Sequence, residues 1–593
     1  MTGRQPMSCA ARIRAQTALR ADRATRGGTG HGQIALLVWL ALLLFACETV
    51  ADAPPPPPVP AASAPPPAVA PTNAPAPTAA PQIVEGGTVV EGVLADAKQF
   101  NSILATDAIS LRVIALLGNR LINLRPDLTP ECDLCESWDI SADNLKVTFR
   151  LRRGVKFHDG RELTADDVKF TYDSILDPAK SSPFQSPLKN YLPGAAAIKA
   201  LDSHTVEFTF TKPKGDALVT DFHTPAILPK HILGNLSARD FANAPFNMQK
   251  PVYTGPFMLK EWIKGERITL MANPTYFRGK PKLDAYVLRV YPDLTSLFAP
   301  LRDGAIDIGT FDVSQLADAQ KLPSIHAYAH PALKFTYLSY QLDPAKSRLF
   351  QDRRVRQALL YALDRKAIVE KVLFGQGIVA ATTVPPQSWA FIPDVPVYGY
   401  DPARARALLD EAGWKVGADG VRAREGARFS FTLLTNAGNR IRETAIVEMQ
   451  RYWNQVGLDV RVQTEEWNAF LKRIGATQDS PRDYAVFVVS FILNADPNQR
   501  LLWHSASAAN GYNFNAYQNA DLDRMLDEAL ATFDAARRKE LYGGMQAWLA
   551  EDLPSAPLFF ESVTGGYTKR LHNFQPGAVG SLNNVHEWWI EAK

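Results

Sequence analysis

Residues 147–160 carry the strongest local pattern in the 593-residue chain. Apolar and polar residues alternate there in two short runs, whose apolar positions are Val147, Phe149, Leu151, Val155 and Phe157. A period of two is typical of half-buried β-strands. Gly154 separates the runs, and Asp159-Gly160 supplies a tight turn after the second one. The pattern predicts two short strands followed by a turn.

A helix start follows this turn. Thr164 is followed three residues later by Asp167, the spacing of a helix N-cap with an acidic first turn. Val168, Tyr172 and Ile175 then recur along one helix face. Residues 147–175 are therefore predicted to form strand, strand, turn and helix, and nothing in them is typical of a catalytic nucleophile.

Residues 151–171 resemble, almost without a break, the pattern LRxGVxFHDGxxLTAxDVxxT. This pattern belongs to extracytoplasmic solute-binding proteins of family 5, which serve peptide, dipeptide and nickel importers of the ABC class. Further matches to the family follow in order at residues 253–262, 352–364 and 400–414. The resemblance implies an α/β fold of the periplasmic binding protein-like II type, in its large cluster C form. That fold has two lobes with mixed sheets plus an extra small domain.

The resemblance also implies how the chain divides. The expected segments are a lipoprotein signal peptide (1–46), a Pro/Ala-rich tether (47–82), a first segment of lobe I (83–125), the small extra domain (126–200), a second segment of lobe I (201–333), lobe II (334–555) and a return to lobe I (556–593).

The N-terminal segment indicates export. An apolar run at residues 34–46 follows a basic region and is shorter than the roughly 20 residues that a membrane-spanning helix needs. Leu44-Phe-Ala-Cys47 resembles the lipobox at which bacterial lipoproteins are cut and lipidated on Cys47. An ordinary signal peptide is the alternative, and translation could instead begin at Met7. Residues 51–81 are mostly Pro, Ala and Val, which favours an extended tether.

Composition weakens the case for a nucleic-acid partner. The chain is 46% hydrophobic and 21% charged, as in ordinary globular proteins. Its formal net charge is +3. Six arginines against one aspartate before Cys47 account for more than this whole excess, so removing that segment leaves a slightly acidic protein.

Two cysteines remain once Cys9 leaves with the signal and Cys47 takes lipid. Cys132 and Cys135 form a Cys-x-x-Cys pair, which in an exported chain indicates a structural disulfide. Free thiols and a metal or redox site are the alternatives.

His326 and His330 have the spacing that would place two imidazoles on one helix face. Prolines at 323 and 331 leave little room for a helix, and no third ligand is evident. No metal and no cofactor are therefore expected.

The end of the buried strand at residues 483–490 departs from the family pattern. In peptide-binding relatives a Trp-x-x-Asp segment pairs its Asp with the α-ammonium group of the ligand. Here Phe491 stands at the Trp position and Asn494 at the Asp position. An amide carries no compensating charge, and a buried unpaired ammonium is costly. Peptides with a free amino terminus are therefore disfavoured, unless Asp496 takes over the role.

Other candidate contacts lie on loops. Asn101 and Ser102 follow the first strand, where the resembled family borders its cleft, although helix capping explains them nearly as well. Trp389 lies on a loop where an aromatic residue can line or cover a pocket. The predicted ligand-binding residues are Asn101, Ser102, Trp389, Trp467, Phe491, Ile492, Asn494, Asp496 and Tyr512.

The predicted function is that of a substrate-binding lipoprotein of an ABC importer. It would capture a peptide-like or other small polar solute between two closing lobes and deliver it to a membrane permease. The protein is expected outside the cytoplasm as a monomer anchored through Cys47. A binding protein that reports to a sensor and a secreted hydrolase are the alternatives. No enzyme is expected, because no Gly-x-Ser-x-Gly, His-Glu-x-x-His or Gly-x-x-x-x-Gly-Lys motif occurs.

Overall fold

The computed structural model describes residues 85–476 and 480–592. The predicted signal peptide (1–46), the lipid site Cys47 and the tether (47–82) lie outside the described residues.

One mixed sheet joins eleven strands of the described chain. In spatial order these are β18 (Asp459–Glu465), β17 (Ser430–Asn436), β19 (Val486–Ile492), β12 (Ile325–Tyr340), β20 (Ser555–Thr568), β11 (Ile308–Thr310), β1 (Thr88–Val93), β10 (Ala285–Val290), β9 (Arg267–Ala272) and β8 (Phe257–Ile263), with β13 (Ile378–Val379) paired to β20. β17 pairs in parallel with β18 and β19, and β1 with β10 and β11, whereas β12 is antiparallel to both of its neighbours. The predicted α/β fold with mixed sheets is confirmed.

Buried side chains divide the described chain into two bodies. One large hydrophobic core combines residues from both ends of the described chain, between Val89 and Ile308 and between Leu571 and Ile590. Two other cores are built from residues between Phe335 and Phe560. We call residues 85–331 and 563–592 lobe I, and residues 332–562 lobe II.

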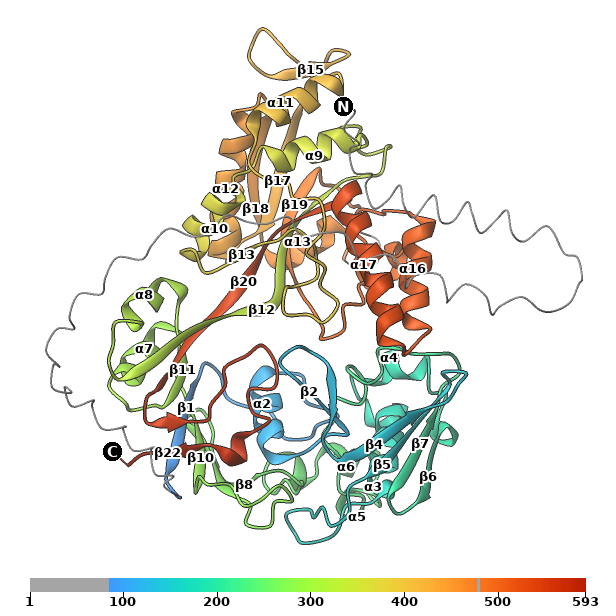
Figure 1. Cartoon of the computed structure of the whole chain (residues 1–593), viewed down its shortest axis with the longest axis vertical. Coiled ribbons are helices and arrows are strands. Elements are labelled where there is room, and N and C mark those ends of the chain that lie inside the picture. Colours follow the sequence, from blue (N-terminus) through green and yellow to red (C-terminus); the bar gives the residue numbers. More distant parts are fainter. Residues whose placement is uncertain (1–84, 477–479, 593) are drawn as a thin grey trace, which may run out of the picture. The chain divides into compact units, whose positions relative to one another are not determined.

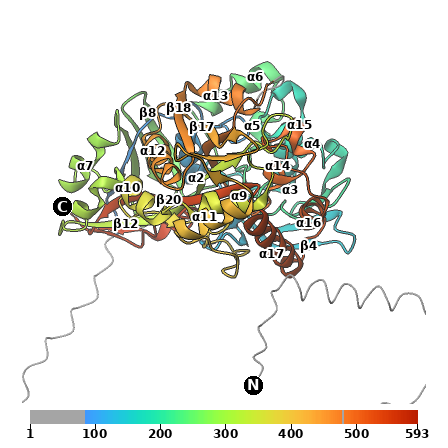
Figure 2. The same ribbon diagram turned by 90° about the horizontal axis from the view of Figure 1, so that it is seen from above.

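β12 and β20 run side by side from one lobe to the other (Figure 1, Figure 2). Their register shifts between Pro331, which faces Ser562, and Phe335, which faces Phe560. Such a β-bulge bends a strand locally, and we take it as the lobe boundary. The predicted return to lobe I at residue 556 is too early, because Phe559 and Phe560 are buried in the cores of lobe II.

Lobe I contains a separate antiparallel sheet in the order β4 (Cys135–Ile140), β5 (Lys146–Leu151), β7 (Thr205–Thr209) and β6 (Ile198–Asp202). The buried residues of this small sheet merge with the main core of lobe I. The small sheet extends past the predicted domain end at residue 200, because β7 pairs with both β5 and β6.

The prediction for residues 147–175 holds for its first strand, its turn and its helix. The first strand is β5, and α3 (Ala165–Leu176) begins with a capping box between Thr164 and Asp167. The turn is made at Gly160, whose φ is +90°. Val155 and Phe157 are fully buried, but the only pairing there is an isolated bridge between Lys156 and Glu162. Their alternation reflects burial in a loop rather than a strand.

Aspartate side chains cap two helices of lobe II. Asp352 accepts a hydrogen bond from Arg354 N at the start of α9, and Asp401 accepts one from Arg404 N at the start of α11. The helices of lobe I are α2 (Ala108–Leu117), α3, α4 (Gln185–Lys189), α5 (Lys230–Leu233), α6 (Ala238–Ala242), α7 (Thr295–Arg302) and α8 (Leu316–Ala319). Those of lobe II are α9 (Arg353–Tyr361), α10 (Arg365–Leu373), α11 (Pro402–Glu411), α12 (Arg440–Asn454), α13 (Trp467–Ile474), α14 (Arg500–Trp503), α15 (Ser507–Asn510), α16 (Ala520–Leu530) and α17 (Ala535–Asp552).

Short strand pairs complete the described structure. They are β2 (Ile122–Leu124) with β3 (Pro130–Cys132), β14 (Lys415–Val416) with β15 (Arg422–Arg424) and β16 (Ala427–Arg428), and β21 (Leu571–His572) with β22 (Trp589–Ile590). Cys132 and Cys135 form a disulfide between β3 and β4. The disulfide interpretation of this pair is therefore the one that the structure supports.

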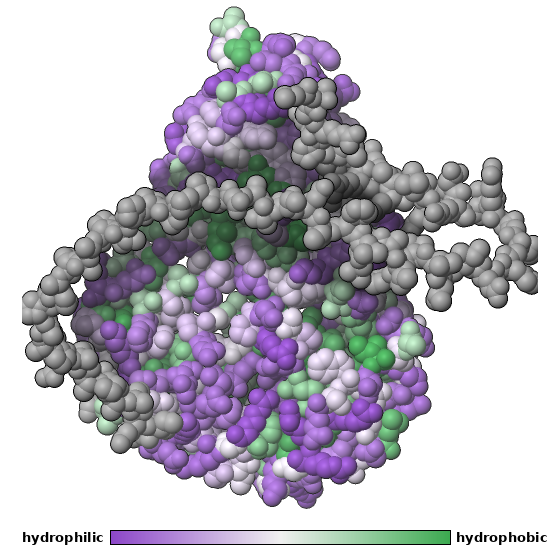
Figure 3. Space-filling model, in the orientation of Figure 1, coloured by the Kyte–Doolittle hydropathy of each residue, from purple (hydrophilic) through white to green (hydrophobic). Residues whose placement is uncertain are grey.

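Within residues 85–476 and 480–592, no helix combines the length and apolar character that crossing a bilayer requires. Figure 3 shows a face on which hydrophilic side chains predominate, with small hydrophobic patches between them.

Candidate functional site

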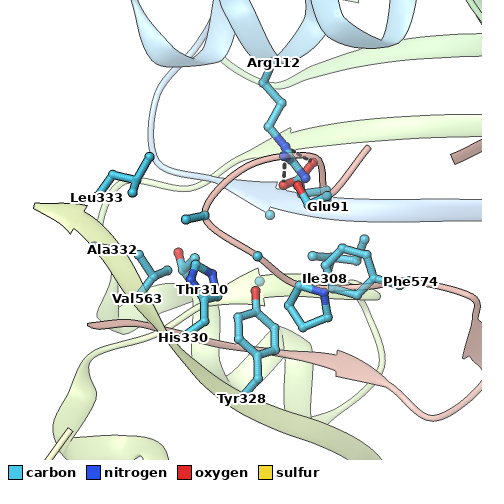
Figure 4. A pocket seen from close by; sticks show the side chains of 16 residues that line it. Glu91, Arg112, Ile308, Thr310, Tyr328, His330, Ala332, Leu333, Val563 and Phe574 are labelled. Atoms are coloured by element: carbon cyan, nitrogen blue, oxygen red, sulfur yellow. Dashed lines mark hydrogen bonds and ion pairs between the residues drawn. The ribbon is translucent and has the colours of Figure 1, made fainter. Parts of the chain in front are cut away.

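A cavity of about 320 Å³ lies at the lobe boundary and is lined mainly by lobe I (Figure 4). Strands β1, β11, β12 and β20, helix α2 and the loop after β21 form its walls. The lining residues are Glu91, Gly92, Arg112, Ile308, Gly309, Thr310, Tyr328, His330, Ala332, Leu333, Val563, Phe574, Pro576, Gly577, Ala578 and Ser581. Clefts of roughly 300–1,000 Å³ with mainly apolar walls and a few polar groups are typical ligand sites.

An ion pair forms the charged part of the wall. Glu91 shares its side of β1 with the buried Val89 and Val93. Arg112 of α2 donates from Nε to the Glu91 carboxylate at 2.8 and 2.9 Å, and Tyr286 Oη donates to it at 2.6 Å. Burial alone would lower the pKa of Arg112, but Glu91 and Tyr286 raise it above its ordinary value. Buried ion pairs seldom stabilise a fold more than apolar residues would, so this pair is a candidate for ligand recognition.

The opposite wall is polar but uncharged. The rings of Tyr328 and His330 stack at 5.8 Å between centroids, and His330 Nδ1 lies 3.3 Å from Pro331 O. Burial lowers the pKa of His330 and raises that of Tyr328 to about 12. Both side chains are therefore neutral at neutral pH. His326 and His330 lie on β12, and no group of three potential metal ligands occurs among the described residues.

Several predicted contacts gather at one edge of lobe II. β17, β18 and β19 are parallel, so their carboxyl ends meet at the same edge, where open α/β sheets bind ligands. Phe491 and Ile492 end β19, and Trp467 follows β18. The Tyr512 ring lies 5.5 Å from that of Phe491. Trp467, Ile492 and Tyr512 are 44%, 75% and 46% exposed, so this edge, which we call the apolar edge, presents large uncovered side chains.

One strand separates the apolar edge from the cavity. Leu493 N donates to Leu333 O at 2.8 Å, and Leu333 lines the cavity. Lys334, the next residue, pairs with Ile492 in the sheet. The segment that departs from the family pattern therefore adjoins the cavity, although none of its residues lines it.

Asp496 has internal partners. Arg538 of α17 donates to its carboxylate at 2.6 Å and Tyr542 Oη donates at 2.8 Å. Asp496 is 3% exposed, whereas Asn494 is exposed. The Trp389 ring lies 6.0 Å from that of Tyr542 and 5.7 Å from the Arg538 guanidinium. Trp389 thus covers this ion pair, and Arg538 already neutralises the carboxylate that could have received a ligand ammonium.

Asn101 and Ser102 are buried away from the cavity. Asn101 Nδ2 donates to Asn247 Oδ1 at 2.9 Å, and its Oδ1 accepts from Ile103 N. Ser102 Oγ donates to Ala226 O at 2.7 Å. Asp107, not either of these residues, caps α2. Both side chains hold loops together in this structure.

Sequence reasoning missed the cavity wall. It gave Glu91 and Arg112 no role, and it considered His330 only as a metal ligand. One available signal was the acid at position 91, between Val89 and Val93 on the buried face of a strand. Such an acid needs a partner, and α2 supplies it.

Comparisons with known proteins span both lobes. Residues 129–513 match the family described as "Bacterial extracellular solute-binding proteins, family 5 Middle". Oligopeptide-binding protein AppA of Bacillus subtilis is 33% identical over 509 residues, which cover 85% of this chain and 92% of that protein. Heme-binding protein A of Haemophilus influenzae is 30% identical over 466 residues, covering 74% and 81%. The structure of Bacillus subtilis AppA in complex with a nonapeptide aligns with a TM-score of 0.66 and 32% identity, covering 86% of this chain and 100% of that one.

Proposed function

This chain belongs to the bacterial extracellular solute-binding proteins of family 5, and from that premise we propose that it binds peptides in the cavity and on the adjoining apolar edge. As a member of this family it is an extracytoplasmic substrate-binding component of an ABC importer. The ligand class is our inference.

The observation that carries the proposal is the adjacency of the two surfaces. The cavity offers hydrogen-bonding groups at Arg112 and Tyr328, and the apolar edge offers exposed side chains such as Ile492. An extended peptide presents a polar backbone with side chains on alternate faces. It can therefore use both surfaces at once, as a small polar solute cannot. The similarity to AppA over nearly its whole length supports the same ligand class.

We infer that binding does not depend on a free amino terminus. Arg538 occupies the carboxylate of Asp496, and Asn494 carries no charge. An α-ammonium group brought to this segment would find no unpaired anion there.

The proposal also covers how the protein is attached to the membrane and how it works with the permease. We propose that Cys47 is lipidated, that the tether at residues 47–82 lets the binding lobes reach the permease, and that the protein acts as a monomer without enzymatic activity. Recognition of loaded protein by a permease requires only that ligand favour one arrangement of the lobes.

Thermal shift and calorimetry with tripeptides to nonapeptides test the ligand class, each peptide being supplied with a free and with an acetylated amino terminus. Some peptides are expected to raise the melting temperature, and acetylation is expected to change Kd by less than about tenfold, or 1.4 kcal/mol. Free heme serves as the competing ligand class. Binding of heme with no response to any peptide would refute the proposed ligand.

Asn494→Asp tests the amino-terminus inference on an exposed position. The new carboxylate is expected to create a preference for free over acetylated peptides, because it supplies the missing counter-charge. A strong preference already present in the unaltered protein would contradict the inference while leaving peptide binding intact.

A further inference from the structure

The two lobes meet at a second place besides the β12 and β20 connection. Gly215 N of lobe I donates to Leu530 O, at the end of α16 in lobe II, at 2.7 Å. Phe533, in the turn between α16 and α17, packs against the main core of lobe I. Figure 1 shows the α16 and α17 pair reaching the side of lobe I that holds the small sheet. A polar and an apolar contact thus join the lobes there.

This contact requires the absence of a side chain at position 215. A Cβ atom on Gly215 would lie 2.0 Å from Thr532 O and 2.9 Å from Thr532 C. Both are backbone atoms, so rotating a side chain cannot relieve the overlap. The φ of Gly215 lies outside the left-handed range. An alanine there would therefore be unstrained within lobe I and would clash only with lobe II.

The lobe I side of the contact is held rigid. Lys214 Nζ lies 2.7 Å from Asp216 Oδ1 and 2.7 Å from Asp221 Oδ2. Its side chain is only 8% exposed. Ala217 N donates to Lys214 O at 2.9 Å and closes the turn. The loop that carries Gly215 is therefore fixed by its own ion pairs.

The lobe II side is equally well braced. Asp534 N donates to Thr532 Oγ1 at 3.1 Å, and Asp534 caps α17. Arg538 Nε donates to Ala529 O at 3.0 Å while the same guanidinium holds Asp496. Arg538 thus connects the end of α16, next to the turn at Thr532, with Asp496 in the segment that follows β19.

An apolar cluster accompanies the hydrogen bond. Its buried members are Leu124, Leu128 and Val219 of lobe I and Ala495 of lobe II. Ala495 immediately precedes Asp496, so the cluster contacts the lobe II segment that Arg538 braces. Burying apolar surface between the lobes favours the joined arrangement whether or not a ligand is present.

We propose that Gly215, Leu530, Thr532 and Phe533 form a lobe latch, which holds the two lobes together before ligand binds. Gly215 permits the close approach, and Phe533 supplies the apolar contact. The inference concerns the free protein and goes beyond the proposed function, since it holds for a ligand of any class. The apparent affinity of a ligand that recognises the joined arrangement scales with the fraction of protein molecules whose lobes are already joined. By raising this fraction, the latch increases the apparent affinity.

Gly215→Ala in the ligand-free protein tests the latch, with Gly399→Ala as the matched control. A Cβ on Gly399 would meet no atom within 4 Å, and its φ is also outside the left-handed range. Small-angle X-ray scattering should show a larger radius of gyration for Gly215→Ala only. Hydrogen exchange of the amides around residues 215 and 529–534 should become about tenfold faster or more. Far-UV circular dichroism should stay unchanged.

Phe533→Ala provides an independent second variant, because this half-buried side chain belongs to lobe II but contacts lobe I. It should give the same expansion and faster exchange. Unchanged scattering and exchange in both variants would overturn the latch. Unfolding of both variants would overturn it as well, since the contact would then be part of a single cooperative core.

Discussion

His158 is held as a neutral imidazole by its two ring contacts. Its Nδ1 accepts from Tyr253 N at 3.3 Å, and its Nε2 lies 3.2 Å from Gly255 O and therefore carries the proton. Protonating Nδ1 would place two donors face to face. Burial lowers the pKa of His158 from 6.5 to about 4, so the folded protein resists protonation at a pH where the unfolded chain accepts it.

The unfolded state therefore binds more protons than the folded state between pH 6.5 and 4, and stability falls as the pH drops through this window. His158→Gln should cost stability at pH 7 but flatten the decline toward pH 4.5, by up to about 1.4 kcal/mol per pH unit. Urea unfolding at several pH values measures this. Burial also lowers the pKa of His223, to about 3, so the His158→Gln variant should retain part of the pH dependence of stability. The exposed His326→Gln is the control, and parallel curves for both variants would contradict the assignment.

The ion pair of Asp496 and Arg538 makes a separate prediction. Asp496→Asn should destabilise lobe II by about 3–5 kcal/mol, because it removes the carboxylate that pairs directly with a buried guanidinium. The double variant Asp496→Asn/Arg538→Gln should recover part of that loss. Denaturant unfolding of the single and double variants measures the coupling. Additive losses would mean that the two residues act independently.

The disulfide braces the junction between β3 and β4. It encloses Asp133, which is 1% exposed and accepts hydrogen bonds from Asn119, Arg120 N and Arg278. The bridge spans a sequence separation of only 3. Replacing both cysteines by serine should therefore cost only about 2 kcal/mol by the chain-entropy argument. Reductant should lower the stability of the unaltered protein equally and leave the double variant unaffected. A larger loss would show that the bridge mainly positions Asp133.

Elements with local causes were predictable from the sequence. Asp352 and Asp401 cap helices because a cap needs only its own next turn, and Gly160 turns the chain because of its φ. The strand assigned to Val155 and Phe157 was wrong because period-two burial also arises in a loop pressed against a core. Local patterns fix helix starts more securely than strands, since strands depend on distant partners.

The candidate site depended on distant partners and was predictable only in part. Phe491, Ile492 and Trp467 lie at one edge because β17, β18 and β19 are parallel, and the Tyr512 ring contacts Phe491 there. Whether the Asp496 carboxylate is available to a ligand depends on Arg538, which lies 42 residues further along the chain. Glu91 meets Arg112 across a strand and a helix, and the cavity itself needs β12 and β20 from opposite ends of lobe II. No local pattern encodes such pairings.

At the scale of the whole molecule, β12 and β20 are both scaffold and connection. They carry the lobe boundary at the register shift between Pro331 and Phe335, while Gly215 and Leu530 join the lobes elsewhere. A bend at the bulge would separate the contact at Gly215 first, because the strands themselves stay hydrogen-bonded across the boundary.

The path of the chain through the lobes sets an order of events during synthesis and export. Lobe II is built from one uninterrupted stretch of the chain. In lobe I, by contrast, β1 near the start of the described chain lies in one sheet with β11 and β20, and the fully buried Trp588 comes from near its end. Lobe I cannot complete its core until residues 571–590 are available to pack into it. β1 can already pair with β10, but the apolar side chains that Trp588 and Ile590 cover stay exposed until then, and exposed apolar surface makes incomplete chains prone to aggregate. β20, the strand that joins the lobes, lies late in the chain. The apolar surface of lobe I is therefore covered only after β20 has paired.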